Sequence, residues 1–351
     1  MPADKKRAVQ SYAIGFVVLP RFNMMALTTT LEPLRVANYV TTDELYVWSF
    51  LSPDGASVTA SNGMSLETEA IDRQKARHWD AVIVCGSWNS EHYDNPDLFA
   101  WLRRMDRKGA ILGSMDIGAY VLARAQLLSG YRATTHWYCV RAFAEQYPNT
   151  LVEEQLFVID RTRMTSAGGT AGLDMMLHEI DRRHGRQLAL EVSDMILHYP
   201  VREPEAPQRQ ALGGKQKSLH PAVREAVSLM ESNLEDHLTV PAIADAVGVS
   251  QRKLERLFAK YMGCSVISFY QLLRLQFARV LLTNTGMSVR EVSVACGFSS
   301  LSYFSKLFGL HFGKRPREYR EAWPELEPAP IWPGTTISLI EAAKQSRTGR
   351  A

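Results

Sequence analysis

The segment Ile111–Tyr120 (ILGSMDIGAY) places a single carboxylate, Asp116, between an apolar strand pattern and a helical pattern. In many α/β enzymes a tight strand–turn–helix of this kind is a nucleophile elbow, which exposes one side chain above the edge of the sheet. We expect a strained backbone at Asp116, with Ile117 beside it, and a helix N-terminus that favours negative charge there. A carboxylate is a poor nucleophile without special activation, so this position favours binding over turnover.

Aromatic and imidazole side chains are candidates for the same site. Trp88 ends the run CGSW, and His136 and Trp137 end the run ATTHW, twenty residues after the elbow. Aromatic faces combined with a carboxylate suit quaternary ammonium or guanidinium groups. Alternatively, Asp116 only caps the elbow helix and both tryptophans pack in the core, while His136 is either a ligand contact or a structural histidine. No compact His/Cys/carboxylate cluster is present, so we expect neither a metal nor a cofactor.

Residues 1–200 alternate between apolar strand patterns and helical patterns, which predicts a parallel sheet covered by helices on both faces. The expected strands are Tyr12–Leu19, Tyr46–Leu51, Ala81–Cys85, Ala110–Gly113 and Leu156–Asp160, and the expected helices include Met25–Tyr39, Asp97–Lys108, Gly118–Leu128 and Thr170–His184.

Cysteine usage and hydropathy indicate a protein of the cytoplasm. The chain has four cysteines and no Cys-x-x-Cys pair, which argues against a disulfide framework or structural zinc. No segment reaches the roughly 18 apolar residues of a membrane helix. The apolar run Ala13–Leu19 ends at Pro20-Arg21 without a small-residue cleavage site, so we interpret it as a buried strand rather than a signal peptide.

The net charge of +3 hides an asymmetry along the chain. Residues 250–320 contain twelve Lys/Arg and three Asp/Glu, a net charge of +9, so the rest of the chain carries −6. A basic C-terminal segment on an acidic body is typical of a polyanion-binding module attached to a separate domain, although a solvated basic surface would look the same.

An internal repeat defines the C-terminal half, which is helical throughout. Two segments about fifty residues apart, starting at Leu238 and Met287, share one template: a hydroxyl N-cap, two apolar turns, a glycine and a second helix. Gly248 and Gly297 are the glycines, which supply the positive φ of a sharp turn. The second helices start at Ser250 and Ser299, and the pattern predicts two helix-turn-helix units.

The faces left exposed on these second helices suit DNA. Basic and hydroxyl side chains can contact phosphates and base edges, and arginine can pair bidentately with guanine. Each residue taken alone would more often belong to a solvated helix face, but two copies with basic faces favour DNA. The candidate contacts are Arg252, Lys253, Glu255 and Arg256 in the first unit, and Leu301, Ser302, Tyr303 and Lys306 in the second.

The C-terminal half resembles the AraC-type transcriptional regulators. The resemblance rests on the runs ARVLL (278–282), MSVREV (287–292), CGFSS (296–300), SYFS (302–305) and FG (312–313), with Pro316 and Tyr319-Arg320, all at intact spacing. It implies two units joined by a long linker helix, about Ser265–Thr283, that sets both reading helices into successive major-groove turns. We therefore divide the chain into a sensing domain (1–200), a linker (201–218), a DNA-binding domain (219–320) and a Pro-rich, partly disordered tail (321–351).

The N-terminal half resembles the PfpI-like, type 1 glutamine amidotransferase-like superfamily, with its flavodoxin-like layers. The family's elbow reads Cys-Thr-Gly-Ala, whereas here it reads Asp-Ile-Gly-Ala (116–119). The segment LEPLRVAN (31–38) resembles the one that supplies the family's site glutamate, which assigns that role to Glu32, and SAGGT (166–170) resembles a loop near the pocket. Asp116 and Glu32 would then repel each other, raising one pKa until a cation relieves the cost.

The combination of both halves resembles GlxA-type regulators over about residues 12–320. Versions with Asp at the elbow resemble regulators of carnitine, glycine betaine and arginine breakdown. The leading hypothesis is a non-enzymatic, ligand-responsive activator of catabolic genes. Its expected partners are double-stranded promoter DNA, a cationic or zwitterionic amine effector and RNA polymerase, and it is expected to form a homodimer without a membrane. The alternatives are a PfpI-like amidase, deglycase or protease tethered to DNA, and an architectural DNA-binding protein with a scaffold domain.

Overall fold

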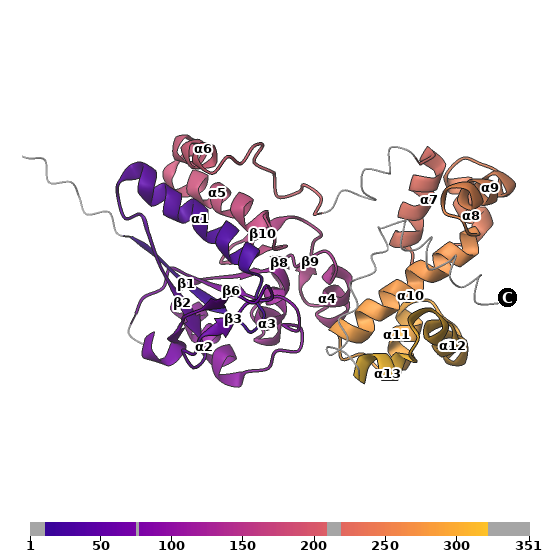
Figure 1. The fold of residues 1–351 in the computed structure, drawn as a ribbon, viewed down its shortest axis with the longest axis horizontal. Helices are drawn as coiled ribbons and strands as arrows, with labels where there is room; N and C mark the ends of the chain where they lie inside the picture. Colours follow the sequence, from indigo (N-terminus) through magenta and orange to yellow (C-terminus); the bar gives the residue numbers. More distant parts are fainter. Residues whose placement is uncertain (1–10, 75–76, 209–218, 322–351) are drawn as a thin grey trace, which may run out of the picture. The chain divides into compact units, whose positions relative to one another are not determined.

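The computed structural model describes residues 11–74, 77–208 and 219–321. The chain divides into two compact units, residues 1–208 and 209–351 (Figure 1).

A seven-stranded sheet forms the centre of the first unit. Its order is β10-β11-β7-β6-β1-β2-β5, and every neighbouring pair is parallel except β10 with β11. This confirms the α/β class. However, the last predicted strand runs antiparallel, and the strand beside it was not predicted. The strands are β1 (Tyr12–Val18), β2 (Tyr46–Ser52), β5 (Glu69–Ala70), β6 (Ala81–Cys85), β7 (Ile111–Met115), β10 (Phe157–Asp160) and β11 (Arg163–Ser166).

Helices cover both faces of this sheet, as Figure 1 shows. On one face lie α1 (Met24–Thr41), α5 (Ala171–His184) and α6 (Arg186–Met195), and on the other lie α2 (Pro96–Arg107) and α3 (Ala119–Arg124). The remaining elements are α4 (Val140–Gln146), the short turns η1 (Ile71–Gln74) and η2 (Asp116–Gly118), and two small two-stranded sheets, β3 (Val58–Thr59) with β4 (Ser65–Leu66) and β8 (Arg132–Ala133) with β9 (Leu151–Val152).

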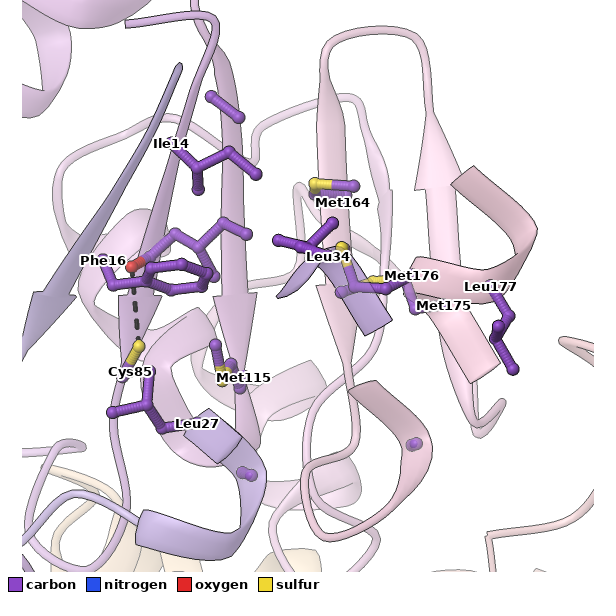
Figure 2. Packing of buried hydrophobic residues seen from close by; sticks show 14 of the residues in the cluster. Ile14, Phe16, Leu27, Leu34, Cys85, Met115, Met164, Met175, Met176 and Leu177 are labelled. Carbon is purple, nitrogen blue, oxygen red and sulfur yellow. Dashed lines mark hydrogen bonds between the residues drawn. The ribbon is translucent and has the colours of Figure 1, made fainter. Parts of the chain in front are cut away.

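The main core lies between the sheet and the α1–α5 layer. Phe16 of β1, Leu27 of α1 and Met175 of α5 are almost completely buried in one apolar cluster (Figure 2). Cys85 and Met115, the last residues of β6 and β7, belong to the same cluster. The elbow at Asp116 therefore begins directly where this close-packed layer ends.

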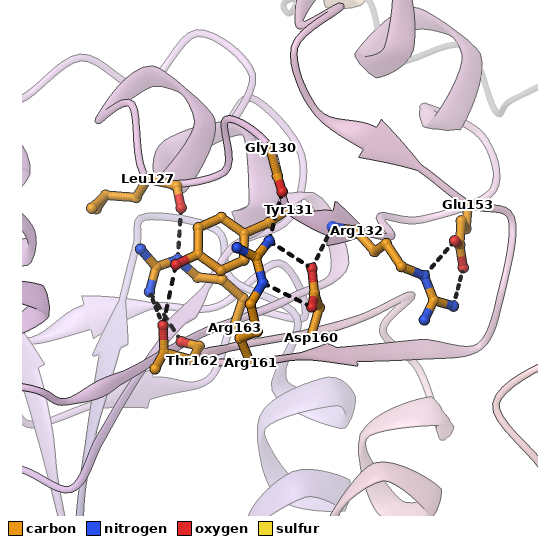
Figure 3. A network of polar contacts seen from close by, with 9 residues as sticks. All are labelled: Leu127, Gly130, Tyr131, Arg132, Glu153, Asp160, Arg161, Thr162 and Arg163. Atoms are coloured by element: carbon orange, nitrogen blue, oxygen red, sulfur yellow. Dashed lines mark hydrogen bonds and ion pairs between the residues drawn. The ribbon is translucent and has the colours of Figure 1, made fainter.

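A polar network anchors the β8 region to the sheet (Figure 3). Arg161 and Arg163 both stack on the Tyr131 ring, with guanidinium carbons 3.8 and 4.4 Å from its centroid. The Nε of Arg163 donates to the Leu127 carbonyl at 2.6 Å, and the backbone N–H of Arg132 donates to Asp160 at 2.9 Å. These contacts fix the start of the segment that carries His136 and Trp137.

The second unit is helical throughout its described residues. Its helices are α7 (Pro221–Ser232), α8 (Val240–Ala246), α9 (Gln251–Tyr261), α10 (Val266–Asn284), α11 (Val289–Ala295), α12 (Leu301–Phe312) and α13 (Pro316–Glu321). The pairs α8–α9 and α11–α12 are the two predicted helix-turn-helix units, and α10 is the predicted linker helix.

The predicted linker differs from the structure over its first half. Residues 201–208 are part of the first unit, to which Arg202 and Gln208 are hydrogen bonded. The rest of the predicted linker and the Pro-rich tail beyond Glu321 lie outside the described residues. Among the helices in the described ranges, none combines the length and apolar character that a bilayer crossing requires.

Candidate functional site

Asp116 occupies a strained turn between β7 and α3. Its φ is +57°, in the left-handed region that non-glycine residues rarely adopt. Two glycines near the turn have no room for a side chain. A Cβ on Gly118 would lie 2.5 Å from the Val84 carbonyl oxygen, and a Cβ on Gly168 would lie 2.8 Å from the Cβ of Asp116. The turn therefore has the geometry predicted for an elbow, and glycines are required around it.

Two hydrogen bonds from other side chains hold Asp116 in place. Asn23 donates from Nδ2 to its Oδ2 at 2.8 Å, and the Thr135 hydroxyl donates to its backbone carbonyl at 2.8 Å. Burial raises the pKa of Asp116, while the charge of His136 and the hydrogen bonds from Asn23 and the Ile117 backbone N–H act in the opposite direction. The carboxyl group is thus desolvated, and a cationic partner would lower its electrostatic cost.

His136 lies close enough to Asp116 for each group to influence the ionisation of the other. Burial lowers the pKa of His136, and the neighbouring Asp116 only partly offsets this effect. The backbone N–H of Tyr138 approaches its Nδ1 at 3.4 Å, so Nδ1 is the acceptor and a neutral ring carries its proton on Nε2. Burial thus disfavours the charged form of both groups, the carboxylate of Asp116 and the imidazolium of His136.

Aromatic rings form a series of contacts that starts at His136. The Trp137 ring packs against His136 at 5.5 Å between centroids, and Trp88 packs edge-on against Tyr138 at 6.1 Å. Both tryptophans are only partly buried, whereas Ile117 is 1% exposed and belongs to the core. We refer to Asn23, Trp88, Asp116, His136 and Trp137 as the elbow site.

The structure does not place Glu32 beside Asp116. Glu32 lies on α1 and forms an ion pair of 2.8 Å with Arg35, and its side chain is 44% exposed. Asn23, the N-cap of α1, takes the expected position instead, because its Oδ1 accepts from Ala26 while its Nδ2 reaches Asp116. The sequence did contain a signal for Asn23, namely a polar residue shortly after β1. Parallel strands end at a common edge of the sheet, so such a residue can lie close to the elbow that follows β7.

A second buried carboxyl group was also missed. Glu91 is 2% exposed, its Oε2 has no hydrogen-bond partner within the described part of the chain, and burial raises its pKa to about 7. The charge on Asp116 raises this pKa further, so the two groups sense each other. Glu91 follows β6 just as Asn23 follows β1.

No exposed thiol accompanies the elbow. All four cysteines are buried, and burial raises the pKa of both Cys85 and Cys139 well above the usual range. A protonated, buried thiol is a weak nucleophile. Across the described ranges, no three His, Cys, Asp or Glu side chains gather as a metal site would require.

The reading helix of the first unit, α9, presents a basic face. Arg252, Lys253 and Arg256 are exposed, while Leu254 and Phe258 are buried against the other helices. Glu255 is turned away from this face, because its Oε2 accepts the backbone N–H of Val266 at 3.2 Å. It caps the start of α10, so a base contact from Glu255 would require this hydrogen bond to break.

The second reading helix, α12, begins one residue later than expected. Ser300, rather than Ser299, is the N-cap and accepts the Tyr303 backbone N–H. Leu301, Ser302 and Lys306 are exposed. Tyr303 is 49% exposed, but its hydroxyl also accepts a hydrogen bond of 3.1 Å from Gln271 of α10.

An open groove of about 1200 Å³ lies beside this helix. Ser302 and Lys306 line it together with Lys314, Arg315 and Arg317, which the sequence analysis did not select. The basic run KRPR (314–317) was the available signal. Basic side chains around a groove of this kind suit a phosphate backbone.

Both turns contain the predicted left-handed glycine. Gly248 has a φ of +67° and Gly297 a φ of +68°. The second turn is also bound to α10 through Arg274, which is 6% exposed. Its guanidinium donates to the carbonyls of Cys296 and Gly297, and the guanidinium carbon lies 4.1 Å from the centroid of the Phe298 ring. The linker helix is thus part of the core of the second unit.

Comparisons with known proteins agree with both halves. Residues 14–182 match the model of the DJ-1/PfpI family, and residues 243–322 match a helix-turn-helix domain. The chain is 41% identical to the HTH-type transcriptional regulator GbdR of Pseudomonas aeruginosa, over 92% of this chain and 87% of that protein. It is 35% identical to the HTH-type transcriptional regulator GlxA of Rhizobium meliloti, over 88% and 95%.

Among solved structures, a THiJ/PfpI family protein from Pseudomonas syringae superposes with a TM-score of 0.50 at 22% identity, covering 70% of this chain and 95% of that one. This likeness supports the α/β fold of the first unit. The elbow, the duplicated helix-turn-helix and the full-length relatives lead to one conclusion: the chain belongs to the GlxA-type, AraC-family HTH-type transcriptional regulators, which join a DJ-1/PfpI domain to a DNA-binding domain, and it regulates transcription by binding promoter DNA.

Proposed function

We propose that this regulator is a ligand-responsive activator of catabolic genes, and that its effector is a small cationic or zwitterionic amine bound at the elbow site. The observation that carries this proposal is Asp116: a buried carboxyl group, close to His136, at the position where related enzymes have a nucleophile. A cation would offset the desolvation of this carboxylate, and Trp88 and Trp137 supply aromatic faces.

The proposal includes the absence of catalysis. Neither an elbow thiol nor an exposed cysteine is available in the described ranges, and a carboxylate at this position lacks an activating base with a raised pKa. Thiol labelling of the native protein is expected to be slow near neutral pH for all four cysteines. A fast-reacting cysteine, or turnover of an amide or glycation substrate by the purified protein, would favour the enzyme hypothesis.

A thermal-shift screen tests the ligand. Glycine betaine, carnitine, arginine and related amines are compared on the wild type and on Asp116→Ala. A binder at 100 times its dissociation constant stabilises the folded state by roughly 2.7 kcal/mol, so the wild type should shift clearly. Asp116→Ala should lose this shift. A variant that still responds fully to the inducer would refute the assignment of the site, and a panel without any shift would favour a scaffold domain.

Operation as a dimer, contact with RNA polymerase and residence in the bacterial cytoplasm complete the proposal. These parts rest on the similarity to transcriptional regulators such as GbdR, whereas the basic faces of α9 and α12 support the contact with DNA. Gel shifts with the DNA upstream of its own gene test the DNA-binding residues, since phosphate contacts must give salt-dependent affinity. Sizing by light scattering, with and without the effector, tests the dimer.

A further inference from the structure

The segment that leaves the first unit is hydrogen bonded, at two separate places, to residues next to the elbow. We call residues 201–208 the exit strap, because the chain passes through them toward the DNA-binding domain. In the middle of this strap, the Pro204 carbonyl accepts the Leu156 backbone N–H at 2.9 Å, just before β10. The strap is therefore docked by its backbone as well as by side chains at either end.

The first anchor is Arg202. Its guanidinium donates to the carboxylate of Asp174 at 3.0 and 2.5 Å, and its backbone N–H donates to the same group at 2.8 Å. The side chain of Asp174 is fully buried. Arg202 also donates to the Thr170 hydroxyl at 2.7 Å, at the end of the loop whose Gly168 packs against Asp116.

The second anchor is Gln208. Its Nε2 donates to the Thr134 hydroxyl at 3.0 Å and to the carbonyls of Thr135 and Gln155 at 3.0 and 2.6 Å. Thr135 in turn donates its hydroxyl to the Asp116 carbonyl at 2.8 Å. A single residue therefore separates the last strap side chain from the elbow backbone.

The chemistry of the amide fixes its orientation. Two of the three acceptors around Gln208 are backbone carbonyls, so the NH₂ group must face them and the oxygen must point away. That oxygen, Oε1, is buried without a hydrogen-bond partner among the described residues. An unpaired buried acceptor makes docking less favourable than full pairing would, so the docked strap is not maximally stable.

We propose that the exit strap transmits the state of the elbow site to the DNA-binding domain, with Gln208 as the coupling residue. The inference rests on the proposed function, in that it takes the elbow as the effector site. A ligand that moves the Asp116 backbone alters the Thr135 contact, which displaces the acceptors of Gln208. The same movement reaches Arg202 through Gly168 and Thr170. Docking or release of residues 201–208 then changes whether the chain that leads to the DNA-binding domain is held at the first unit up to Gln208.

Hydrogen exchange of the full chain, measured without any ligand, tests the coupling. Thr135→Val removes the hydroxyl that joins the segment to the elbow, and Thr41→Val removes a comparable hydroxyl at the end of α1. Exchange of peptides covering 201–208 should rise about tenfold in Thr135→Val and stay unchanged in Thr41→Val. Equal exchange in both variants would overturn the proposal.

Gln208→Glu provides a second measurement if Thr135→Val does not fold. This isosteric change turns a donor toward two carbonyls into an acceptor, so exchange should rise at 201–208 and, by reciprocity, at residues 116–118. A rise confined to the strap would refute coupling to the elbow. Thermal unfolding of the wild type is then measured with glycine betaine and carnitine. An unchanged melting temperature would refute the proposed effector. The hydrogen exchange measured without ligand would still decide whether the strap is coupled to the elbow.

Discussion

The side-chain amide of Asn23 bridges the N-terminus of α1 and the elbow, because its Oδ1 caps the Ala26 N–H at 3.2 Å while its Nδ2 donates to Asp116 at 2.8 Å. One residue thus sets both the start of a helix and the orientation of the candidate ligand carboxylate. A movement of Asp116 is therefore expected to displace Asn23 and with it the first turn of α1.

The variant Asn23→Asp separates these two tasks. Aspartate caps a helix as well as asparagine does, but it places a second carboxylate against Asp116. Their repulsion raises the folded-state pKa of the pair above the unfolded value, so stability is lost as pH rises through that interval. Thermal scans from pH 5 to pH 8 should show a growing deficit relative to the wild type, of about 1–3 kcal/mol at the upper end. A deficit independent of pH would contradict this.

Asp116→Asn is expected to stabilise the ligand-free protein. Burial raises the pKa of Asp116, so ionisation in the folded state costs free energy that asparagine avoids. The gain should be about 1 kcal/mol at pH 7.5 and should disappear as pH falls toward the unfolded-state pKa. Urea unfolding at several pH values measures it, with the exposed Asp194→Asn as the control. In the same variant, amines should no longer raise the melting temperature, so the substitution would increase stability and remove ligand binding.

The two turn glycines should respond differently to alanine. A Cβ on Gly248 meets nothing within 4 Å, whereas a Cβ on Gly297 would lie 2.3 Å from the Glu235 carbonyl oxygen. Gly248→Ala should therefore cost only left-handed strain, about 1 kcal/mol, and Gly297→Ala about 3 kcal/mol or more. Calorimetry of both variants measures the difference. Equal losses would mean that the Glu235 backbone can move aside.

Salt dependence should identify the phosphate contacts of the second unit. Lys306→Ala and Lys314→Ala should each weaken binding to all DNA sequences and reduce the slope of log affinity against log salt by about 0.9. Arg256→Ala should instead relax discrimination at one base pair by about 1–3 kcal/mol if it reads guanine. Arg107→Ala, an exposed arginine of the first unit, should leave the slope unchanged. A slope unaffected by either lysine change would place the groove away from DNA.

The sequence predicted best what is encoded locally. The caps and left-handed glycines of both helix-turn-helix units are short-range signals, and the structure confirms them, apart from a shift of one position between the adjacent residues Ser299 and Ser300. The strained turn at Asp116 followed in the same way from a strand, a glycine-containing turn and a helix.

The side chains that approach Asp116 depend on the order of the strands in the sheet, and the sequence did not predict them. Asn23 and Glu91 approach Asp116 only because β1, β6 and β7 lie next to one another and end at one edge. Resemblance led instead to Glu32, whose charge is satisfied by Arg35. In the four-residue strand β11 three residues are polar or charged, so its sequence has no alternation that would identify a strand. Glu255 was placed on the DNA face from helix periodicity alone, and its hydrogen bond to Val266 could not be foreseen because it depends on packing against α10.

Arg274 gives the linker helix a mechanical role. Because its guanidinium holds the carbonyls at the end of α11 and stacks on Phe298, α10 and the second turn must change orientation as one body. We therefore expect a tilt of the α10 axis to carry α12 with it, so that a small angular displacement at one end of α10 becomes a translation of the reading helix across the major groove of the DNA.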